Sequence, residues 1–189
     1  MTVVVSMLRG VNLGPYNRIR MDDLRKVYRS LGLRDVQTCL QSGNVVFQTA
    51  GRGLAKLQRR IEAAIESNFG VHTDVILRTS SELRGVVAAN PFAGRTGIDP
   101  SKLLVEFLAA ELSPEAAAKL LSVDIDPEEL RIHGRELYIY FSNGLARPKL
   151  SPALMDRTVK MPCTGRNWNT VTKLLEMAEA REHEGSSDF

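Results

Sequence analysis

The chain has 189 residues, 43% of them hydrophobic, and a formal net charge of +3. This composition predicts a globular protein with a proper core, and it excludes a membrane protein because no apolar stretch approaches the roughly 18 residues that a membrane span needs. The two cysteines, Cys39 and Cys163, exclude a disulfide framework and a zinc site of four cysteines. Residues 1–8 lack the basic start of a signal peptide, so we expect a cytoplasmic protein.

The first part of the chain predicts one α+β module. Its elements, in order, are a strand at 3–8, a helix at 21–31, strands at 36–40 and 45–48 joined by a tight turn, a helix at 54–65 and a strand at 73–77. This order is typical of the ferredoxin-like fold, in which two helices cover one face of a four-stranded antiparallel sheet. Because the first strand is apolar on both faces, we expect the second half of the chain or another subunit to cover the other face.

A short helix at 81–89 and a connection rich in Pro and Gly at 90–100 lead to a second module. Its predicted elements are a strand at 102–108, a helix at 116–121, a hairpin of 129–133 with 136–141, a helix at 151–159 and a last helix that begins near Thr164 or Asn167. The expected fold is therefore α+β, with two ferredoxin-like (β-α-β-β-α) modules and antiparallel sheets. The first module spans residues 1–90, and the second, with the terminal helix, spans residues 91–189.

Three polar segments, remote from one another in sequence, are candidates for ligand binding. They are the loop after the first strand with Arg9, Asn12 and Asn17, the hairpin turn with Ser42 and Asn44, and the start of the last helix with Arg166, Asn167, Asn169 and Lys173. On a helix, Arg166, Asn169 and Lys173 share one face, where free backbone amides and cations can hold an anion. We therefore predict that the three segments converge and bind a small phosphate- or carboxylate-bearing ligand between the modules.

The same residues also suit purely structural roles. Gly and Asn serve turn geometry in the opening loop and in the hairpin turn at 42–44, and Asn and Thr cap helices. His72 and Asp74 supply only two metal ligands, and neither cysteine has a histidine within local reach. We therefore expect no metal and no cofactor, and an enzyme of unknown reaction stays open as an alternative function.

Nucleic-acid binding is a further alternative. The outward faces of the first two helices are basic and carry Arg25, Lys26, Arg29, Lys56, Arg59 and Arg60. Against an RNA-recognition sheet, the first strand has no aromatic residue and the third has Phe47 alone. We expect no membrane partner, and the oligomeric state stays open.

Several stretches together resemble one known family. They are LRGVNLG at 8–14, MDDLR at 21–25, LGL at 31–33, QSGNVVF at 41–47, NPF at 90–92 and RNWNTV at 166–171. These stretches are spread over nearly the whole chain and resemble the bacterial family DUF1697. The resemblance implies a cytoplasmic bacterial protein built of ferredoxin-like α+β modules, and it supplies no catalytic residues or cofactor.

Overall fold

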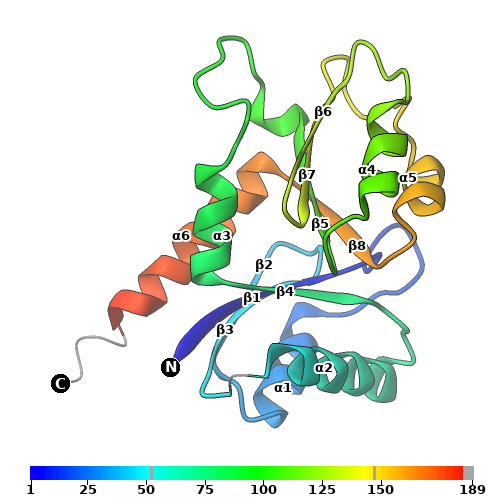
Figure 1. The fold of residues 1–189 in the computed structure, drawn as a ribbon. Coiled ribbons are helices and arrows are strands. Elements are labelled where there is room, and N and C mark those ends of the chain that lie inside the picture. The colour runs from blue at the N-terminus through cyan, green and yellow to red at the C-terminus, as the bar shows by residue number, and fades with distance from the viewer. Residues whose placement is uncertain (52, 147, 185–189) are drawn as a thin grey trace. The chain divides into compact units, whose positions relative to one another are not determined.

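The computed structural model describes residues 1–51, 53–146 and 148–184, which form two compact units (Figure 1). Unit 1 consists of Met1–Gly85 together with Lys173–Phe189, and unit 2 consists of Val86–Thr172. The chain passes from one unit to the other within two helices, α3 (Ser80–Ala88) and α6 (Trp168–Glu184). No helix in the described ranges is both long and apolar enough to cross a bilayer.

Unit 1 is a ferredoxin-like module. Its elements are β1 (Thr2–Leu8), α1 (Met21–Ser30), β2 (Arg34–Cys39), β3 (Asn44–Thr49), α2 (Leu54–Phe69) and β4 (Val75–Thr79). The strands pair antiparallel in the order β2-β3-β1-β4, so β1 lies inside the sheet and β2 at an edge. The predicted order of elements is confirmed. Most ends of the strands differ from the predicted ends by one or two residues.

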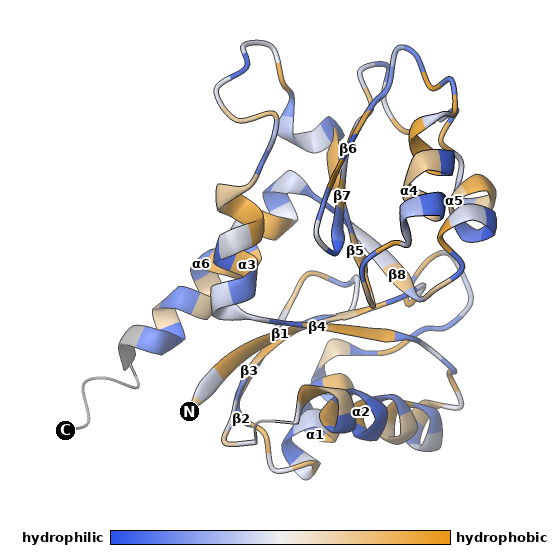
Figure 2. Ribbon diagram, in the orientation of Figure 1, coloured by the Kyte–Doolittle hydropathy of each residue, from blue (hydrophilic) through white to orange (hydrophobic). Residues whose placement is uncertain are grey.

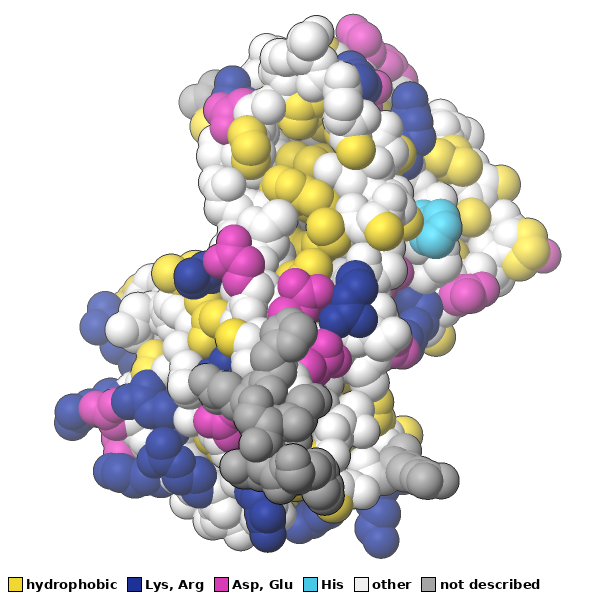
Figure 3. Space-filling model, turned by 90° about the vertical axis from the view of Figure 1, so that its left-hand side faces the viewer, with side chains coloured by type: hydrophobic (Ala, Val, Ile, Leu, Met, Phe, Trp, Pro, Cys, Tyr) yellow, Lys and Arg dark blue, Asp and Glu magenta, His cyan; other side chains and the backbone are white. Residues whose placement is uncertain are grey.

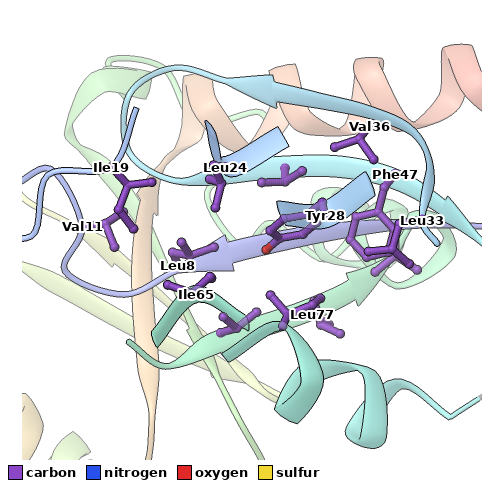
Figure 4. Close-up of a cluster of buried hydrophobic side chains, with 14 of the residues drawn as sticks. Leu8, Val11, Ile19, Leu24, Tyr28, Leu33, Val36, Phe47, Ile65 and Leu77 are labelled. Carbon is purple, nitrogen blue, oxygen red and sulfur yellow. The ribbon is translucent and has the colours of Figure 1, made fainter. Parts of the chain in front are cut away.

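The core of unit 1 lies between the sheet and the two helices. Figure 4 shows Leu24 and Tyr28 of α1 and Ile65 of α2 facing Leu8 of β1. Along α1 the buried residues recur every three or four positions, which places them on one side of the helix. Figure 2 shows the result, with hydrophobic and hydrophilic residues alternating along α1 and α2. Burial of this apolar side against the sheet fixes both helices on one face.

The other face of this sheet is also covered, as the apolar character of β1 predicts. Val3, Val5 and Met7 point away from α1 and α2, and all three are buried. Gln48, which lies opposite Val3 in the register of the sheet, donates a hydrogen bond of 3.2 Å to the backbone oxygen of Arg181 in α6. The part of α6 that belongs to unit 1 therefore lies over this face.

Two arginines fix this part of α6 to unit 1. The Arg181 side chain is only 5% exposed, and its Nε lies 3.3 Å from Oδ2 of Asp35 at the start of β2. Arg84 of α3 donates from Nε to Glu179 at 2.9 Å and from Nη2 to Glu182 at 2.7 Å. These carboxylates raise the pKa of Arg84 through direct hydrogen bonds. One buried and one exposed charged contact thus hold this part of α6 on unit 1.

Unit 2 repeats the same order of elements. They are β5 (Leu103–Leu108), preceded by the short 3-10 helix η1 (Pro100–Lys102), then α4 (Pro114–Leu121), β6 (Glu129–His133), β7 (Glu136–Tyr140), α5 (Pro152–Val159) and β8 (Cys163–Asn167). The sheet order is β6-β7-β5-β8, again antiparallel throughout. The fold class of two ferredoxin-like modules with antiparallel sheets is therefore confirmed.

The second face of this sheet makes contacts with residues of unit 2 that precede β5. The Tyr138 hydroxyl donates a hydrogen bond of 2.7 Å to the backbone oxygen of Val86 at the end of α3, and burial raises the pKa of Tyr138. Phe92, in the connection after α3, packs against Tyr140 with 5.9 Å between ring centroids. Val86 and Phe92 therefore cover part of this face.

One prediction for this unit is wrong. Residues 163–167 form the strand β8, so Thr164 does not begin the last helix. The alternative start near Asn167 is confirmed, because α6 begins at Trp168 and the Oδ1 of Asn167 accepts a hydrogen bond of 2.9 Å from the backbone amide of Thr170.

The two sheets also agree in register. Val5 of β1 lies opposite Arg78 of β4, and Val105 of β5 lies opposite Arg166 of β8. Both arginines are buried. Each donates from Nη1 to the backbone oxygen of the residue before it, at 2.9 Å for Arg78 and at 2.8 Å for Arg166. The two units thus share one topology and, at this register position, a buried arginine with the same backbone hydrogen bond.

Candidate functional site

The loop between β1 and α1 is held in shape by two asparagines. Asn12 has a φ of 56°, and its Nδ2 donates to the backbone oxygens of Ile19 at 3.0 Å and of Gln41 at 2.6 Å. Asn17 has a φ of 51° and donates to the backbone oxygen of Gly10 at 3.4 Å. Asparagine tolerates this left-handed conformation better than most residues. Both predicted ligand residues therefore serve the loop itself.

The turn between β2 and β3 packs directly against this loop. A Cβ atom added at Gly43 would lie 2.5 Å from Cγ2 of Val11 and 2.9 Å from Cβ of Leu8, and φ at Gly43 is 72°. Asn44 is buried and donates to the backbone oxygen of Cys39 at 3.1 Å and to Oγ of Ser42 at 2.9 Å. Two of the three predicted segments thus lie side by side in unit 1.

Arg9 lies at the end of β1 beside an acidic residue. Its Nη1 is 3.3 Å from Oδ2 of Asp74, and the two side chains are 38% and 33% exposed. The Oγ1 of Thr73 donates to the backbone oxygen of Arg9 at 2.7 Å, which ties the segment before β4 to the end of β1. The charge of Arg9 is therefore partly balanced by a carboxylate of unit 1.

A groove opens next to the loop and the turn, between the start of α1 and the end of the edge strand β2. Its volume is about 520 Å³, and its lining residues are Arg20, Met21, Asp22, Arg25, Thr38, Leu40 and Gln41. Arg25 donates to the Asp22 carboxylate and, at 2.6 Å, to Oγ1 of Thr38. Arg20 is exposed at the residue before α1, a helix that has no side-chain cap at its amino end.

The groove combines groups that suit an anion. Two guanidinium groups, a hydroxyl and a side-chain amide surround one space, and the single carboxylate, Asp22, is already bonded to Arg25. Arginine forks match the geometry of carboxylate and phosphate oxygens. Cys39 next to this wall is buried, and burial raises the pKa of its thiol despite the positive charge of Lys173. A buried thiol with a raised pKa is typical of a structural cysteine.

The groove residues were only partly visible in the sequence. Arg25 is predicted there as an exposed residue on a basic helix back, and Gln41 as part of a turn. A signal for Arg20 was its position directly before a helix that lacks a capping side chain. Thr38 and Leu40 carried no signal, because a groove between two elements exists only once those elements pack.

The third predicted segment is divided between the two units. Arg166 lies in β8, so the expected helix face shared by Arg166, Asn169 and Lys173 is wrong. Burial lowers the pKa of Arg166 to about 10, which leaves it charged at neutral pH, and its Nη1 donates to Oγ1 of Thr164 at 2.8 Å. Asn167 caps α6 and Asn169 is exposed.

Lys173 belongs to unit 1 together with Arg9, Asn12, Asn17, Ser42 and Asn44, whereas Arg166, Asn167 and Asn169 belong to unit 2. Its Nζ lies 3.2 Å from Oε2 of Glu176. A ligand that bridges the two units stays a prediction.

Charge is distributed unevenly along the chain. Residues 1–85 contain 13 Lys and Arg against 7 Asp and Glu, a formal charge of +6, whereas residues 86–172 contain 10 of each. Figure 3 shows many Lys and Arg side chains gathered on one part of the surface that faces the viewer. Within the described ranges, no three His, Cys, Asp or Glu side chains gather closely enough to hold a metal ion. The β1 to β4 part of unit 1 is thus the part of the chain that favours anionic partners.

Comparisons with known proteins agree with this architecture. A sequence model of the family described as "Protein of unknown function (DUF1697)" matches residues 1–138. Among curated proteins, none matches the chain. One similar solved structure is that of the conserved bacterial protein SP0830 from Streptococcus pneumoniae, with 22% sequence identity and a TM-score of 0.71 over 94% of this chain and 98% of that one. At this identity the likeness shows a shared fold alone.

Proposed function

Because the chain belongs to the DUF1697 family, whose description assigns no function, we propose from its own geometry that it binds a small phosphate- or carboxylate-bearing ligand. The binding site of this proposal is the groove between α1 and β2. In this proposal Arg20 and Arg25 bind the anionic oxygens of the ligand, and Thr38 and Gln41 supply further hydrogen bonds. The proposal narrows the sequence prediction of an anion site to unit 1.

The observation that carries the proposal is the position of Arg25. Its guanidinium lies across the groove from α1 to β2, held by Asp22 on its own helix and by Thr38 on the strand. A cation held at both sides loses little conformational entropy when a ligand arrives, which favours binding. Arg20, exposed at the same groove, supplies a second charge without such a constraint.

The test is anion binding to the full chain, measured by calorimetry with inorganic phosphate, pyrophosphate and citrate as probes. We expect binding of at least one probe and a rise in melting temperature, because a ligand of the native state stabilises it. Arg20→Ala weakens this binding about tenfold, since hydrogen bonds to charged groups are among the strong ones. The backbone oxygen of Arg20, which accepts from Asp23 and Leu24, is unchanged by this substitution.

Arg18→Ala is the matched control. Arg18 is exposed in the same loop, two residues earlier, and does not line the groove. If both variants weaken binding equally, the effect is one of net charge and the groove is not the site. If none of the three probes binds the native protein, the proposal is wrong.

A second candidate function is binding of a nucleic acid to the basic faces of α1 and α2. The charge of +6 on residues 1–85 favours it, together with the exposed Lys26, Arg29, Arg59 and Arg60. Phosphate contacts release counterions, so affinity for an oligonucleotide has to fall steeply with added salt. The double change Arg59→Glu with Arg60→Glu abolishes such binding, whereas Arg157→Glu on α5 of unit 2 leaves it intact. Binding that is insensitive to salt would exclude this function.

A further inference from the structure

Leu40 has an unusual conformation at the groove. It follows β2 directly, its φ is 60°, and it is 62% exposed while lining the groove. A left-handed conformation brings the Cβ of an L-residue close to the next carbonyl oxygen, so a bulky aliphatic residue there is an outlier. Three residues later, at Gly43, the same turn has a glycine for its positive φ.

The fold gains little from a leucine at this position. Glycine or asparagine would relieve the backbone, and a mostly exposed side chain contributes little apolar burial. Strained residues of this kind concentrate at ligand sites, where another requirement holds them. Here the side chain presents an aliphatic surface to a groove whose other groups are mostly polar.

The loop beside the groove carries two more exposed apolar side chains. Leu13 is 71% exposed and Tyr16 is 78% exposed. Leu13 directly follows Asn12, whose Nδ2 lies 2.6 Å from the backbone oxygen of the groove residue Gln41. Among the described residues, six large hydrophobic side chains are exposed, and three of them come from this loop and turn. Cations and apolar surface therefore occur together at this end of unit 1.

From this arrangement we infer that the ligand is an amphiphilic anion, such as an alkyl or aryl phosphate or carboxylate. Its charged group binds to Arg20 and Arg25, and its apolar part packs on Leu40. The inference rests on the proposed function and adds the chemical class of the ligand to it. Inorganic phosphate would fill only the charged half of such a site.

The experiment compares inorganic phosphate with methyl, butyl and hexyl phosphate on the full chain by calorimetry. Affinity for the native protein is expected to rise about two- to fourfold for each methylene that contacts Leu40, in line with the transfer of apolar groups from water. Leu40→Asn removes the aliphatic surface and suits the positive φ. This variant is expected to melt about 2 °C higher, to bind phosphate as the native protein does, and to lose the gain with chain length.

Leu121→Asn is the matched control, since Leu121 is 58% exposed at the end of α4 in unit 2 and lies outside the groove. It is expected to retain the full gain with chain length. If hexyl phosphate binds native protein no tighter than phosphate, or if Leu40→Asn keeps the gain, the inference is overturned while the anion site stands. If Arg20→Ala leaves the binding of every probe unchanged, the proposed function itself fails.

Discussion

Unit 1 and unit 2 use one framework and differ in what is attached to it. In both, the first strand lies inside the sheet, and a buried arginine occupies the same register position on the neighbouring edge strand. In unit 1, however, residues 9–20 form a long loop before the helix, where unit 2 has only residues 109–113. The groove lies next to the long loop.

The hairpin turns of the two units differ at the position that the long loop contacts. The backbone amide of Leu8 donates to the backbone oxygen of Gly43, and that of Leu108 donates to the backbone oxygen of Arg135. Gly43 and Arg135 therefore occupy equivalent positions in the two units. Val11 from the long loop lies over Gly43 and leaves no room for a side chain, whereas unit 2 has an arginine there. The comparison teaches that the shared positions build the sheet and that the unequal loops create the site.

The largest expected effect tests this close approach. Gly43→Ala places a methyl group against Val11 and Leu8 and requires alanine to adopt a φ of 72°. We expect a loss of about 3 kcal/mol in the free energy of unfolding by urea, from steric overlap and backbone strain together.

Gly134→Ala in the unit 2 hairpin is the control for this change. Its φ is 56°, but the nearest atom to an added Cβ is 3.9 Å away. Only the backbone penalty applies, and we expect about 1 kcal/mol. Equal losses for the two alanines would show that the loop does not constrain the turn.

An intermediate effect concerns the cover of the unit 1 sheet. Arg181→Ala removes the buried guanidinium that contacts Asp35, and we expect a loss of about 1–2 kcal/mol, less than for a fully buried pair because Asp35 is 36% exposed. Hydrogen exchange in β1 should accelerate with it. Arg84→Ala removes a more exposed contact of the same helix and should have a smaller effect. The opposite ranking would mean that α6 is held at its outer edge.

The smallest effect concerns the surface of unit 2. Arg95 donates to both carboxylate oxygens of Glu129 at 2.9 Å, and these bonds hold the pKa of Glu129 below its usual value of 4.5. A carboxyl group whose pKa is lowered by folding stabilises the folded protein above pH 4.5. This stabilisation is lost as the pH falls through the pKa of the folded state. Glu129→Gln should therefore cost about 0.5 kcal/mol at pH 7, and the difference from the native protein should vanish once the pH falls below the lowered pKa of Glu129. A difference that is independent of pH would contradict this assignment.

Most of the fold was predictable because its apolar residues follow helix or strand periodicity. The strand β8 was not, since Cys163, Thr164, Gly165, Arg166 and Asn167 show no apolar alternation. Its glycine is required by packing: a Cβ at Gly165 would lie 2.6 Å from Oε2 of Glu106 and 3.1 Å from Cδ2 of Leu104 on β5. Such a contact between distant segments leaves no local pattern.

The site was predictable only in part. The structure places the loop and the turn side by side, yet Asn12, Asn17 and Asn44 each donate a hydrogen bond to a backbone oxygen of unit 1. Asparagine beside glycine indicates a turn as readily as a ligand, and the sequence does not distinguish the two. The groove is lined by residues at the start of α1 and at the end of β2, including Arg20 just before the helix and Leu40 just after the strand, and these segments become neighbours only through packing.

The return of α6 to unit 1 has a consequence for synthesis on the ribosome. Residues 173–184 are translated after the whole of unit 2, although they cover a face formed by residues of β1. Until that helix emerges, the part of this face around Val3 and Gln48 lacks its cover, and exposed apolar surface of this kind favours aggregation. The unit that is translated first is therefore completed after its neighbour, and this interval is when a chaperone would matter most.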